Sequence, residues 1–183
     1  MVRIGLIADT HIPEAAPELP EEVIQVFRGM DMILHAGDLH VLSVLDRLEA
    51  LAPVYGVRGN GDDGGSGRPV VPEDPRLKET QILSVEGLRI GMLHTLPWFM
   101  EYPHRLSDAV AQRFGQQVDI IVHGDTHVAE IERREGVLLV NPGSPTLPNN
   151  LTFRAGTVAV LEVAGRRAQV RLLQLRNNPE AHQ

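Results

Sequence analysis

The 183-residue chain has no cysteine, few aromatic residues and no long apolar segment. The absence of cysteine excludes disulfides and thiolate metal sites. Because no segment approaches the ~20 apolar residues of a membrane-spanning helix, we expect no membrane partner. Met1 leads straight into an apolar segment without the basic start of a signal peptide, so we expect a cytoplasmic protein.

The chain also has fewer basic residues than acidic residues. The chain has 17 Lys and Arg residues against 24 Asp and Glu residues, a formal net charge of −7. Proteins that bind nucleic acid broadly need a basic face, so a nucleic-acid partner is not expected. The hydrophobic content of 43% and the charged content of 22% are ordinary for a globular protein. The length predicts a single domain over residues 1–183, with a frayed tail at 176–183.

What the chain does contain is a repeated pattern in which an apolar, strand-like segment ends in a residue able to bind metal. The pattern occurs five times, and its polar residues are Asp9, His11, Asp38, Asn60, His94, Asp125 and His127. The carboxyl ends of the strands in an α/β sheet meet at one crevice, so these side chains should converge. The pattern therefore predicts a metal site.

The chemistry of these side chains indicates which metals would bind. Carboxylate, amide and imidazole groups favour hard or borderline divalent ions, with Mn²⁺ first and then Ni, Fe, Zn or Mg. Two such ions about 3.5–4 Å apart can clamp the attacking and leaving oxygens of a phosphoryl displacement. A pair of ions needs a bridging carboxylate, and Asp38, which arrives alone on the second strand, is the natural bridge.

The order of apolar segments predicts an α/β fold that ends in antiparallel strands. Short apolar runs between turn residues predict strands, and helical spacing of apolar residues predicts helices. The expected strands span residues 2–8, 31–36, 53–58, 79–86, 88–93, 118–123, 128–134, 137–140, 157–163 and 167–175. The expected helices span residues 21–29, 40–51 and 104–115. A Gly- and Pro-rich loop at 61–75 should hang over the site.

Taken in order, these motifs resemble those of the calcineurin-like metallophosphoesterases. The matching segments are Asp9-Thr10-His11, Gly37-Asp38, Gly59-Asn60, His94, Gly124-Asp125-Thr126-His127 and Asn141-Pro142-Gly143-Ser144, of which the last should form a rigid turn under the site. The chain is most similar to the small single-domain branch, which includes bacterial and archaeal phosphodiesterases and the scaffold subunit of retromer. The resemblance implies a four-layer α/β/β/α sandwich, in which helices flank two mixed β-sheets.

The resemblance also implies how the ligands are shared between two divalent metal ions. Metal one would be bound by Asp9, His11, Asp38 and His127, and metal two by Asp38, Asn60, His94 and Asp125. A water or hydroxide bridging both ions would be the nucleophile, since metal binding lowers the pKa of water. Asp38, Asn60 and His94 would be the catalytic residues, and Asn60 would also bind substrate.

Three positions depart from the family pattern. Asp125 replaces the first His of the last motif, Gly61 stands where many relatives have a proton-donating His and this branch often has Cys, and Thr95 stands where Gly is common. Three carboxylates and one hydroxide would nearly neutralise two divalent ions, so the second site should favour Mn or Mg over Zn. The carboxylate of Asp125 has a shorter reach than imidazole, so it ligates either directly or through a water.

Three further histidines have different expected roles. His35 and His123 each end an apolar strand and should be buried and hydrogen-bonded rather than bind metal. His40 lies where the second helix should begin, and it either faces solvent or has a role at the site, where it reaches the substrate phosphate or donates a proton. The aromatic cluster at residues 98–102 belongs to the core, a substrate wall or a dimer contact, which leaves a homo-oligomer open.

Two functions are compatible with this resemblance. The first is a metal-dependent hydrolase of small phosphate esters, with phosphodiesters favoured because the similar branch commonly acts on them. The alternative is a non-catalytic protein-binding scaffold, as in retromer, that retains the metal site. Six of the seven ligand positions match the family and the seventh is still a competent ligand, which favours the enzyme.

Overall fold

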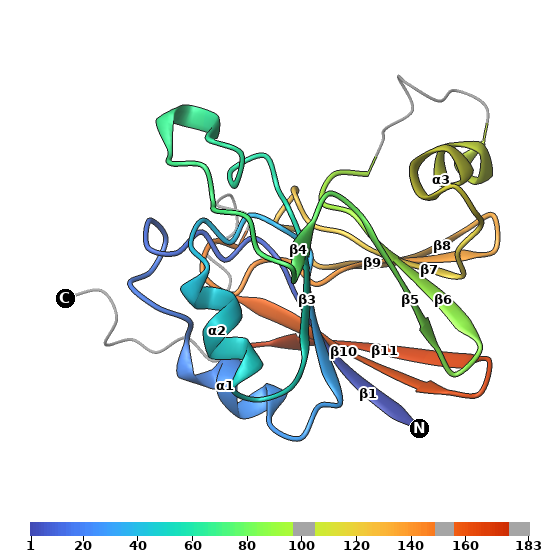
Figure 1. Cartoon of the computed structure of the whole chain (residues 1–183). Coiled ribbons are helices and arrows are strands. Elements are labelled where there is room, and N and C mark those ends of the chain that lie inside the picture. Colours follow the sequence, from blue (N-terminus) through green and yellow to red (C-terminus); the bar gives the residue numbers. More distant parts are fainter. Residues whose placement is uncertain (97–104, 149–155, 176–183) are drawn as a thin grey trace.

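The computed structural model describes residues 1–96, 105–148 and 156–175, which form two β-sheets and three α-helices (Figure 1). The six-stranded sheet contains β1 (Val2–Ile7), β2 (Met32–His35), β3 (Val54–Val57), β4 (Leu77–Lys78), β10 (Thr157–Ala164) and β11 (Arg167–Gln174), in the order β11-β10-β1-β2-β3-β4. The five-stranded sheet contains β5 (Gln81–Val85), β6 (Leu88–Met92), β7 (Ile120–Val122), β8 (Glu130–Arg134) and β9 (Val137–Asn141), in the order β5-β6-β7-β9-β8. The helices are α1 (Glu21–Phe27), α2 (Ser43–Glu49) and α3 (Leu106–Phe114).

Both sheets are mixed, and their central strands are parallel. β1, β2 and β3 run side by side in one direction, as do β6, β7 and β9. Antiparallel strands complete each sheet, since β10 pairs with β1, β5 with β6 and β8 with β9. Because parallel strands end at the same edge, the segments that follow them leave each sheet on one side.

Three clusters of buried apolar side chains separate four layers. The first cluster lies between the six-stranded sheet and helices α1 and α2, and it contains Phe27 and Leu45. The second lies between the two sheets and contains Leu34 and Ile90. The third lies between the five-stranded sheet and α3 and contains Val110. In Figure 1, α1 and α2 lie outside one sheet and α3 lies outside the other, so the predicted four-layer sandwich is confirmed.

Neighbouring residues in the central strands belong to different clusters. Ile33 packs with the helix side of its sheet, whereas Leu34 packs between the sheets. In the same way Ile121 packs beneath α3, whereas Ile120 packs between the sheets. This sorting follows from the two-residue period of a strand. It also explains why these strands are continuous apolar runs in the sequence, because both of their faces are buried.

The boundaries expected from the sequence need two corrections. α2 begins at Ser43 rather than at residue 40, because His40 has a left-handed backbone with a φ of 70° and cannot belong to a right-handed helix. β4 is not expected from the sequence, because its two residues are too few to show an alternating pattern. The aromatic cluster at 98–102 and the expected frayed tail at 176–183 lie outside the described residues.

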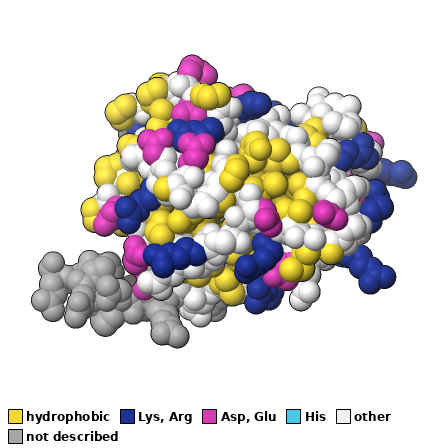
Figure 2. Space-filling view, turned by 60° about the horizontal axis from the view of Figure 1, so that its bottom comes forward, with side chains coloured by type: hydrophobic (Ala, Val, Ile, Leu, Met, Phe, Trp, Pro, Cys, Tyr) yellow, Lys and Arg dark blue, Asp and Glu magenta, His cyan; other side chains and the backbone are white. Residues whose placement is uncertain are grey.

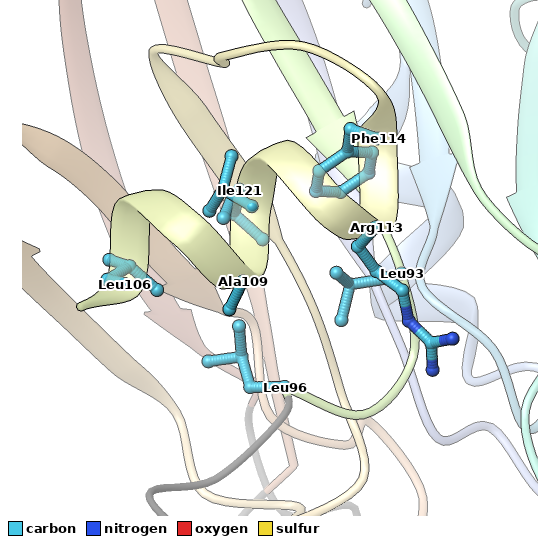
Figure 3. A pocket seen from close by; sticks show the side chains of 8 residues that line it. Leu93, Leu96, Leu106, Ala109, Arg113, Phe114 and Ile121 are labelled. Atoms are coloured by element: carbon cyan, nitrogen blue, oxygen red, sulfur yellow. The ribbon is translucent and has the colours of Figure 1, made fainter. Parts of the chain in front are cut away.

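An apolar pocket lies beneath α3 and continues the third cluster (Figure 3). Its lining residues are Leu93, Leu96, Leu106, Ala109, Val110, Arg113, Phe114 and Ile121. These side chains include no general base and no nucleophile. On the face shown in Figure 2, Lys and Arg are interspersed with Asp and Glu, and no His is visible among the described residues. None of the described helices is long and apolar enough to cross a membrane.

Two glycines let the helices approach the sheets closely. A Cβ atom at Gly5 in β1 would lie 2.9 Å from the ring of Phe27 in α1. A Cβ atom at Gly91 in β6 would lie 2.8 Å from the ring of Phe114 in α3. Carbon atoms that are not bonded prefer separations of about 3.5–4.0 Å. In each sheet, an aromatic ring therefore fills the space that a side chain would need.

We predict that Gly91→Ala lowers the free energy of unfolding by about 1–3 kcal/mol, the usual cost of overpacking. In a double-mutant cycle, Phe114→Leu should recover part of this loss, because the smaller side chain leaves room for the new methyl group. Ser84→Ala, at an exposed position in the neighbouring strand β5, is the control. Chemical denaturation measures these free energies, and a Gly91→Ala protein as stable as the native chain would contradict the close approach.

Candidate metal centre

Three Asp-x-His segments share an unusual backbone conformation. Eight non-glycine residues of the described chain have a positive φ, and six of them belong to these segments: Asp9, His11, Asp38, His40, Asp125 and His127. The segments come shortly after β1, β2 and β7. Left-handed backbone is uncommon for residues other than glycine, although Asp and His adopt it more readily than most. Such strain persists only where surrounding contacts hold the backbone, and it is concentrated at functional sites.

The carboxylate of Asp62 holds the second of these segments. Asp62 Oδ1 accepts hydrogen bonds from the backbone N–H groups of Leu39 (3.0 Å) and His40 (2.8 Å), and Oδ2 accepts from those of Asp38 (2.9 Å) and Gly59 (2.8 Å). The side chain is fully buried, and burial raises its pKa although the N–H donors oppose the rise. One residue thus joins the ends of β2 and β3. The sequence signal for this role is only an Asp in a glycine-rich turn.

The segment 141–144 supports the site from below, as expected. The side-chain amide of Asn141 donates to the carbonyl oxygen of Gly124 (3.0 Å), just before the third Asp-x-His segment. The hydroxyl of Ser144 donates to the carbonyl oxygen of Asp9 (2.6 Å) in the first one. Both side chains are fully buried. The segment therefore supports the site as predicted, and it connects two of the three Asp-x-His segments, whereas its rigidity stays a prediction.

Backbone carbonyls orient two of the histidines. His94 Nδ1 lies 2.8 Å from the carbonyl oxygen of Ala36, and His127 Nδ1 lies 2.7 Å from that of Leu147. Because a carbonyl oxygen can only accept, each Nδ1 carries the proton and each Nε2 keeps its lone pair. Metal-binding histidines in proteins are usually oriented by such a contact.

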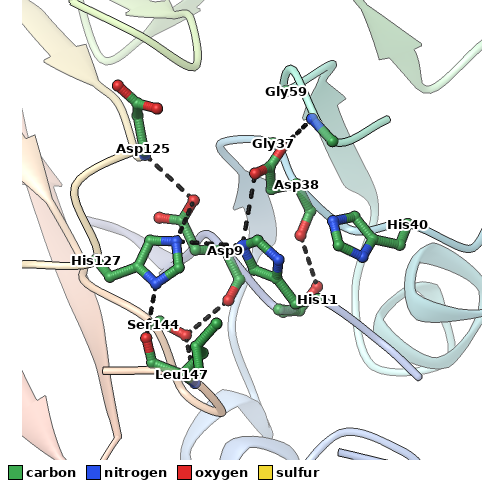
Figure 4. A network of polar contacts seen from close by, with 12 residues as sticks. Asp9, His11, Gly37, Asp38, His40, Gly59, Asp125, His127, Ser144 and Leu147 are labelled. Carbon is green, nitrogen blue, oxygen red and sulfur yellow. Dashed lines mark hydrogen bonds and ion pairs between the residues drawn. The ribbon is translucent and has the colours of Figure 1, made fainter. Parts of the chain in front are cut away.

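The Nε2 atoms of these two histidines and of His11 face the carboxylates of Asp9 and Asp38, and Figure 4 shows His11 and His127 in this arrangement. His94 Nε2 lies 3.6 Å from Asp38 Oδ1 and 4.0 Å from Asp9 Oδ1. His127 Nε2 lies 3.7 Å from Asp9 Oδ1, and His11 Nε2 lies 3.5 Å from Asp38 Oδ2. The ligand atoms form three overlapping groups, in each of which they lie within 4.8 Å of one another: Asp9, His11 and His127; His11, Asp38 and His40; Asp9, Asp38 and His94.

Several of these atoms need a partner that the described residues do not supply. Asp9 Oδ2, His40 Nε2 and His94 Nε2 are buried, and they make no hydrogen bond with any described residue. Buried polar atoms are almost always paired. In addition, His11 Nε2 and His127 Nε2 face each other at 3.2 Å, a separation that two imidazole ligands of one cation can adopt. The residues present therefore fit bound divalent cations.

Burial shifts the pKa values in this cluster. Burial, followed by the nearby carboxylate of Asp38, raises the pKa of Asp9 well above its usual value. Burial lowers the pKa of His11 to about 4, so its ring is neutral at neutral pH. A metal ion needs the carboxylate form of Asp and the neutral form of His. A bound cation would favour the Asp9 carboxylate, and His11 already has the required form.

Two of the predicted ligands lie at the edge of the cluster. The side chain of Asp125 is 35% exposed, and its Oδ1 lies 3.8 Å from His94 Nε2. In Figure 4 this carboxylate points away from Asp9, which accepts the backbone N–H of Asp125 (3.2 Å). Asn60 is exposed in the turn after β3. Direct metal ligation by Asp125 and by Asn60 stays a prediction.

The three remaining histidines of the described chain, His35, His40 and His123, are buried. His40 does not face solvent, which was one of its two expected orientations, because its side chain is only 2% exposed and its Nδ1 lies 2.8 Å from Glu14 Oε2. His35 and His123 are buried at the ends of β2 and β7, as expected. The backbone N–H of Gly37 donates to His35 Nδ1 (3.2 Å), so His35 supports the turn before Asp38.

Comparisons of the sequence with known proteins agree with this arrangement. Residues 2–166 match the profile of the calcineurin-like phosphoesterase superfamily domain. A probable metallophosphoesterase of Methanothermobacter thermautotrophicus is 37% identical over 174 residues, which cover 93% of this chain and 91% of the relative. A probable metallophosphoesterase of Methanocaldococcus jannaschii is 36% identical over 148 residues, which cover 79% of this chain and 69% of the relative.

Solved structures share the fold. Vps29 from Entamoeba histolytica, in complex with zinc, is similar with a TM-score of 0.73 at 24% identity, and the match covers 97% of this chain and 94% of that one. Vps29 from Chaetomium thermophilum has a TM-score of 0.75 at 24% identity, and the match covers 98% of this chain and 90% of that one. At this level of identity the likeness concerns the fold alone.

The neutral His35 predicts a fold that loses stability in acid. His35 Nδ1 accepts the Gly37 N–H, and protonation of Nδ1 would break that hydrogen bond. Burial lowers the pKa of His35 from 6.5 to about 3. Between these two values the unfolded chain binds a proton that the folded chain does not bind. Stability contributed by the neutral ring is therefore complete above pH 6.5 and falls as the pH falls.

The free energy of unfolding of the native chain should fall when the pH is lowered from about 7 to about 5. We predict that this fall is roughly 2 kcal/mol smaller in His35→Asn. The amide oxygen of Asn can still accept the Gly37 N–H, and Asn does not titrate in this range. Urea denaturation in the presence of a chelator measures the difference without metal. Between about pH 7 and about pH 8 the two proteins should respond alike, which is the control. An identical acid response of both proteins would show that His35 is not the titrating group.

Proposed function

Because the chain belongs to the calcineurin-like phosphoesterase superfamily, we propose that it is a metal-dependent phosphoesterase acting on small phosphate esters. Phosphodiesters are the favoured class, because the single-domain branch that the chain resembles commonly acts on them. The observation that carries the proposal is the convergence of five ligand side chains from four strand ends: Asp9, His11, Asp38, His94 and His127. Their unpaired lone pairs and buried carboxylates suit divalent cations.

Two divalent cations would share these side chains. Asp9, His11, Asp38 and His127 would bind one ion, and Asp38 and His94 would bind the other, with Asn60 and Asp125 completing it from the edge. Bound ions would supply Lewis-acid activation of water and would neutralise charge on the phosphoryl group. Oxygen and nitrogen ligands without thiolates favour Mn²⁺ among the available ions.

Asp38 has the position that a bridging carboxylate requires. Its Oδ1 faces His94 Nε2 at 3.6 Å, and its Oδ2 faces His11 Nε2 at 3.5 Å. The backbone N–H of Gly61 donates to Oδ1 (2.7 Å), which restricts rotation of the carboxylate. The two oxygens of one side chain are therefore directed at two different histidines, and each can bind its own cation.

Substrate contacts would come from the segment that follows β3. Asn60 is exposed beside Gly61, and its amide would donate a hydrogen bond to a phosphoryl oxygen. The Gly- and Pro-rich loop at 61–75 begins there, so it would contact the rest of the ester. Loops of this kind carry specificity in many enzymes because they tolerate changes in sequence.

The alternative function is a protein-binding scaffold that retains the metal site. Its support is the likeness to the Vps29 structures, which concerns the fold. The cluster favours the enzyme, because a scaffold needs neither oriented Nε2 atoms nor a carboxylate placed between two histidines. A metal-loaded protein without turnover on any phosphate ester would decide for the scaffold.

Asp38→Asn should abolish metal-dependent turnover, because a neutral amide is a poor bridge between two cations. We expect turnover to fall by at least about 100-fold, because mutation of groups that only orient metal ligands already lowers activity by up to that factor. Hydrolysis of bis-p-nitrophenyl phosphate and p-nitrophenyl phosphate is measured after chelation and after Mn²⁺ is restored. Asp108→Asn, the same change at an exposed position in α3, is the control. Native turnover in the Asp38 variant would exclude the bridging role.

Asp125→His should shift metal preference toward Zn²⁺ relative to Mn²⁺, because imidazole is a softer ligand than carboxylate. It should also lower the pH at which the rate rises, since the cluster gains one unit of positive charge and the reacting water becomes more acidic. Metal titrations and pH profiles of turnover measure both effects. Glu130→His, at an exposed position in β8, is the control. If both profiles match those of the native chain, Asp125 does not contact a metal.

A further inference from the structure

Each pair of the three ligand groups of the centre shares one residue. Asp9, His11 and Asp38 each belong to two of the three groups, and each group is completed by one further histidine. Two of these completing histidines, His127 and His94, belong to the ligand set that the resemblance implies. The third, His40, completes the group of His11 and Asp38 and has no role in that set. Three imidazoles therefore complete the ligand groups, rather than the two that the resemblance implies.

The side chain of His40 is oriented as a metal ligand would be. Its Nδ1 lies 2.8 Å from Glu14 Oε2, and a carboxylate can only accept, so Nδ1 carries the proton. The lone pair of Nε2 is then directed away from Glu14. That atom is buried and makes no hydrogen bond with any described residue. A carboxylate that orients a histidine in this way is a common partner of metal-binding imidazoles.

The surroundings of His40 hold this orientation from both sides. The rings of His40 and His11 meet edge to face, with centroids 4.4 Å apart and an interplanar angle of 75°. On the other side, Arg68 Nε lies 3.5 Å from Glu14 Oε1, so a loop residue pairs with the carboxylate that orients the ring. The backbone N–H of His40 is bound by Asp62, as described above. Side chain and backbone are thus both restrained.

Position 61 and His40 compete for the same space. A Cβ atom at Gly61 would lie 2.5 Å from His40 Nε2 and 3.0 Å from Asp38 Oδ1. Any side chain at position 61 would therefore displace the imidazole. This explains in physical terms why glycine stands where many relatives of similar sequence have His or Cys. The ring of His40 fills that space from a different strand end.

We propose that His40 is a ligand of the metal centre, whose Nε2 binds the cation held by His11 and Asp38, with Glu14 as its positioning residue. The proposal rests on the metal centre of the proposed function, but not on turnover. A ligand role accounts for the unpaired Nε2 and for the absence of a side chain at Gly61. It also accounts for the place of His40 in a group whose ligand atoms lie within 4.8 Å of one another. A histidine that only contacts substrate would need no place among the metal ligands.

Mn²⁺ binding to the chelator-treated full chain tests this assignment without measuring turnover. Isothermal titration should show affinity weakened about 10–100-fold in Glu14→Gln, and at least as much in His40→Ala. Glu18→Gln is the matched control, because Glu18 lies in the same loop, is 69% exposed and pairs with Arg47. Electron spin echo modulation of the Mn²⁺-loaded proteins should show one fewer coordinated nitrogen in His40→Ala. Added imidazole should restore part of its affinity.

A measurement on the native chain keeps the test valid if His40→Ala does not fold. In ¹⁵N-labelled protein titrated with Zn²⁺, the Nε2 resonance of His40 should shift together with that of His11. Unchanged affinity and nitrogen count in His40→Ala, or an unshifted His40 resonance, would overturn the proposal. A native chain that binds no Mn²⁺ would overturn the metal centre and the proposed function together. If the native chain binds Mn²⁺ and His40→Ala weakens this binding, but no phosphate ester is hydrolysed, the ligand role of His40 is supported and the phosphoesterase activity is rejected.

Discussion

Two buried carboxylates without basic side chains beside them impose the main constraint on this molecule. Asp9 is fully buried and Asp38 is 5% exposed, and their described ion-pair partners are histidines. Burying carboxylates is costly unless opposite charge comes with them. The surrounding protein supplies imidazoles whose Nε2 atoms face these carboxylates, and bound cations would supply the opposite charge. The fold brings the ligands together, and the metal ions would balance their charge.

Backbone conformation helps to direct these ligands toward one another. The Asp and the His of each Asp-x-His segment have left-handed backbone, which turns both side chains of a short segment toward one space. Such turns are held from outside, by the carboxylate of Asp62 in one case and by the hydroxyl of Ser144 in another. The strain is thus located where the chemistry is, and the strands behind it have ordinary geometry.

The sequence predicts well whatever depends on local pattern. The strands, the helices and the strand-end positions of Asp9, Asp38 and His94 follow from apolar period and from the type of residue at each end. Contacts between distant segments are not encoded in that way. The contact of Glu14 with His40 joins residues 26 positions apart, and the space filled at Gly61 depends on it. For this reason the burial of His40, the start of α2 at Ser43 and the partial exposure of Asp125 could not be predicted from sequence patterns.

The four hydrogen bonds of Asp62 fix the ends of β2 and β3 relative to each other at the point where the loop 63–75 begins. The backbone that carries Asp38 and Gly59 is tied to this carboxylate, whereas residues 63–75 come after it. The loop is anchored at two further points, because Val71 belongs to the first core cluster and Arg68 pairs with Glu14. Changes at the exposed positions between these anchors would leave the strand ends, and the candidate ligands that they carry, in place.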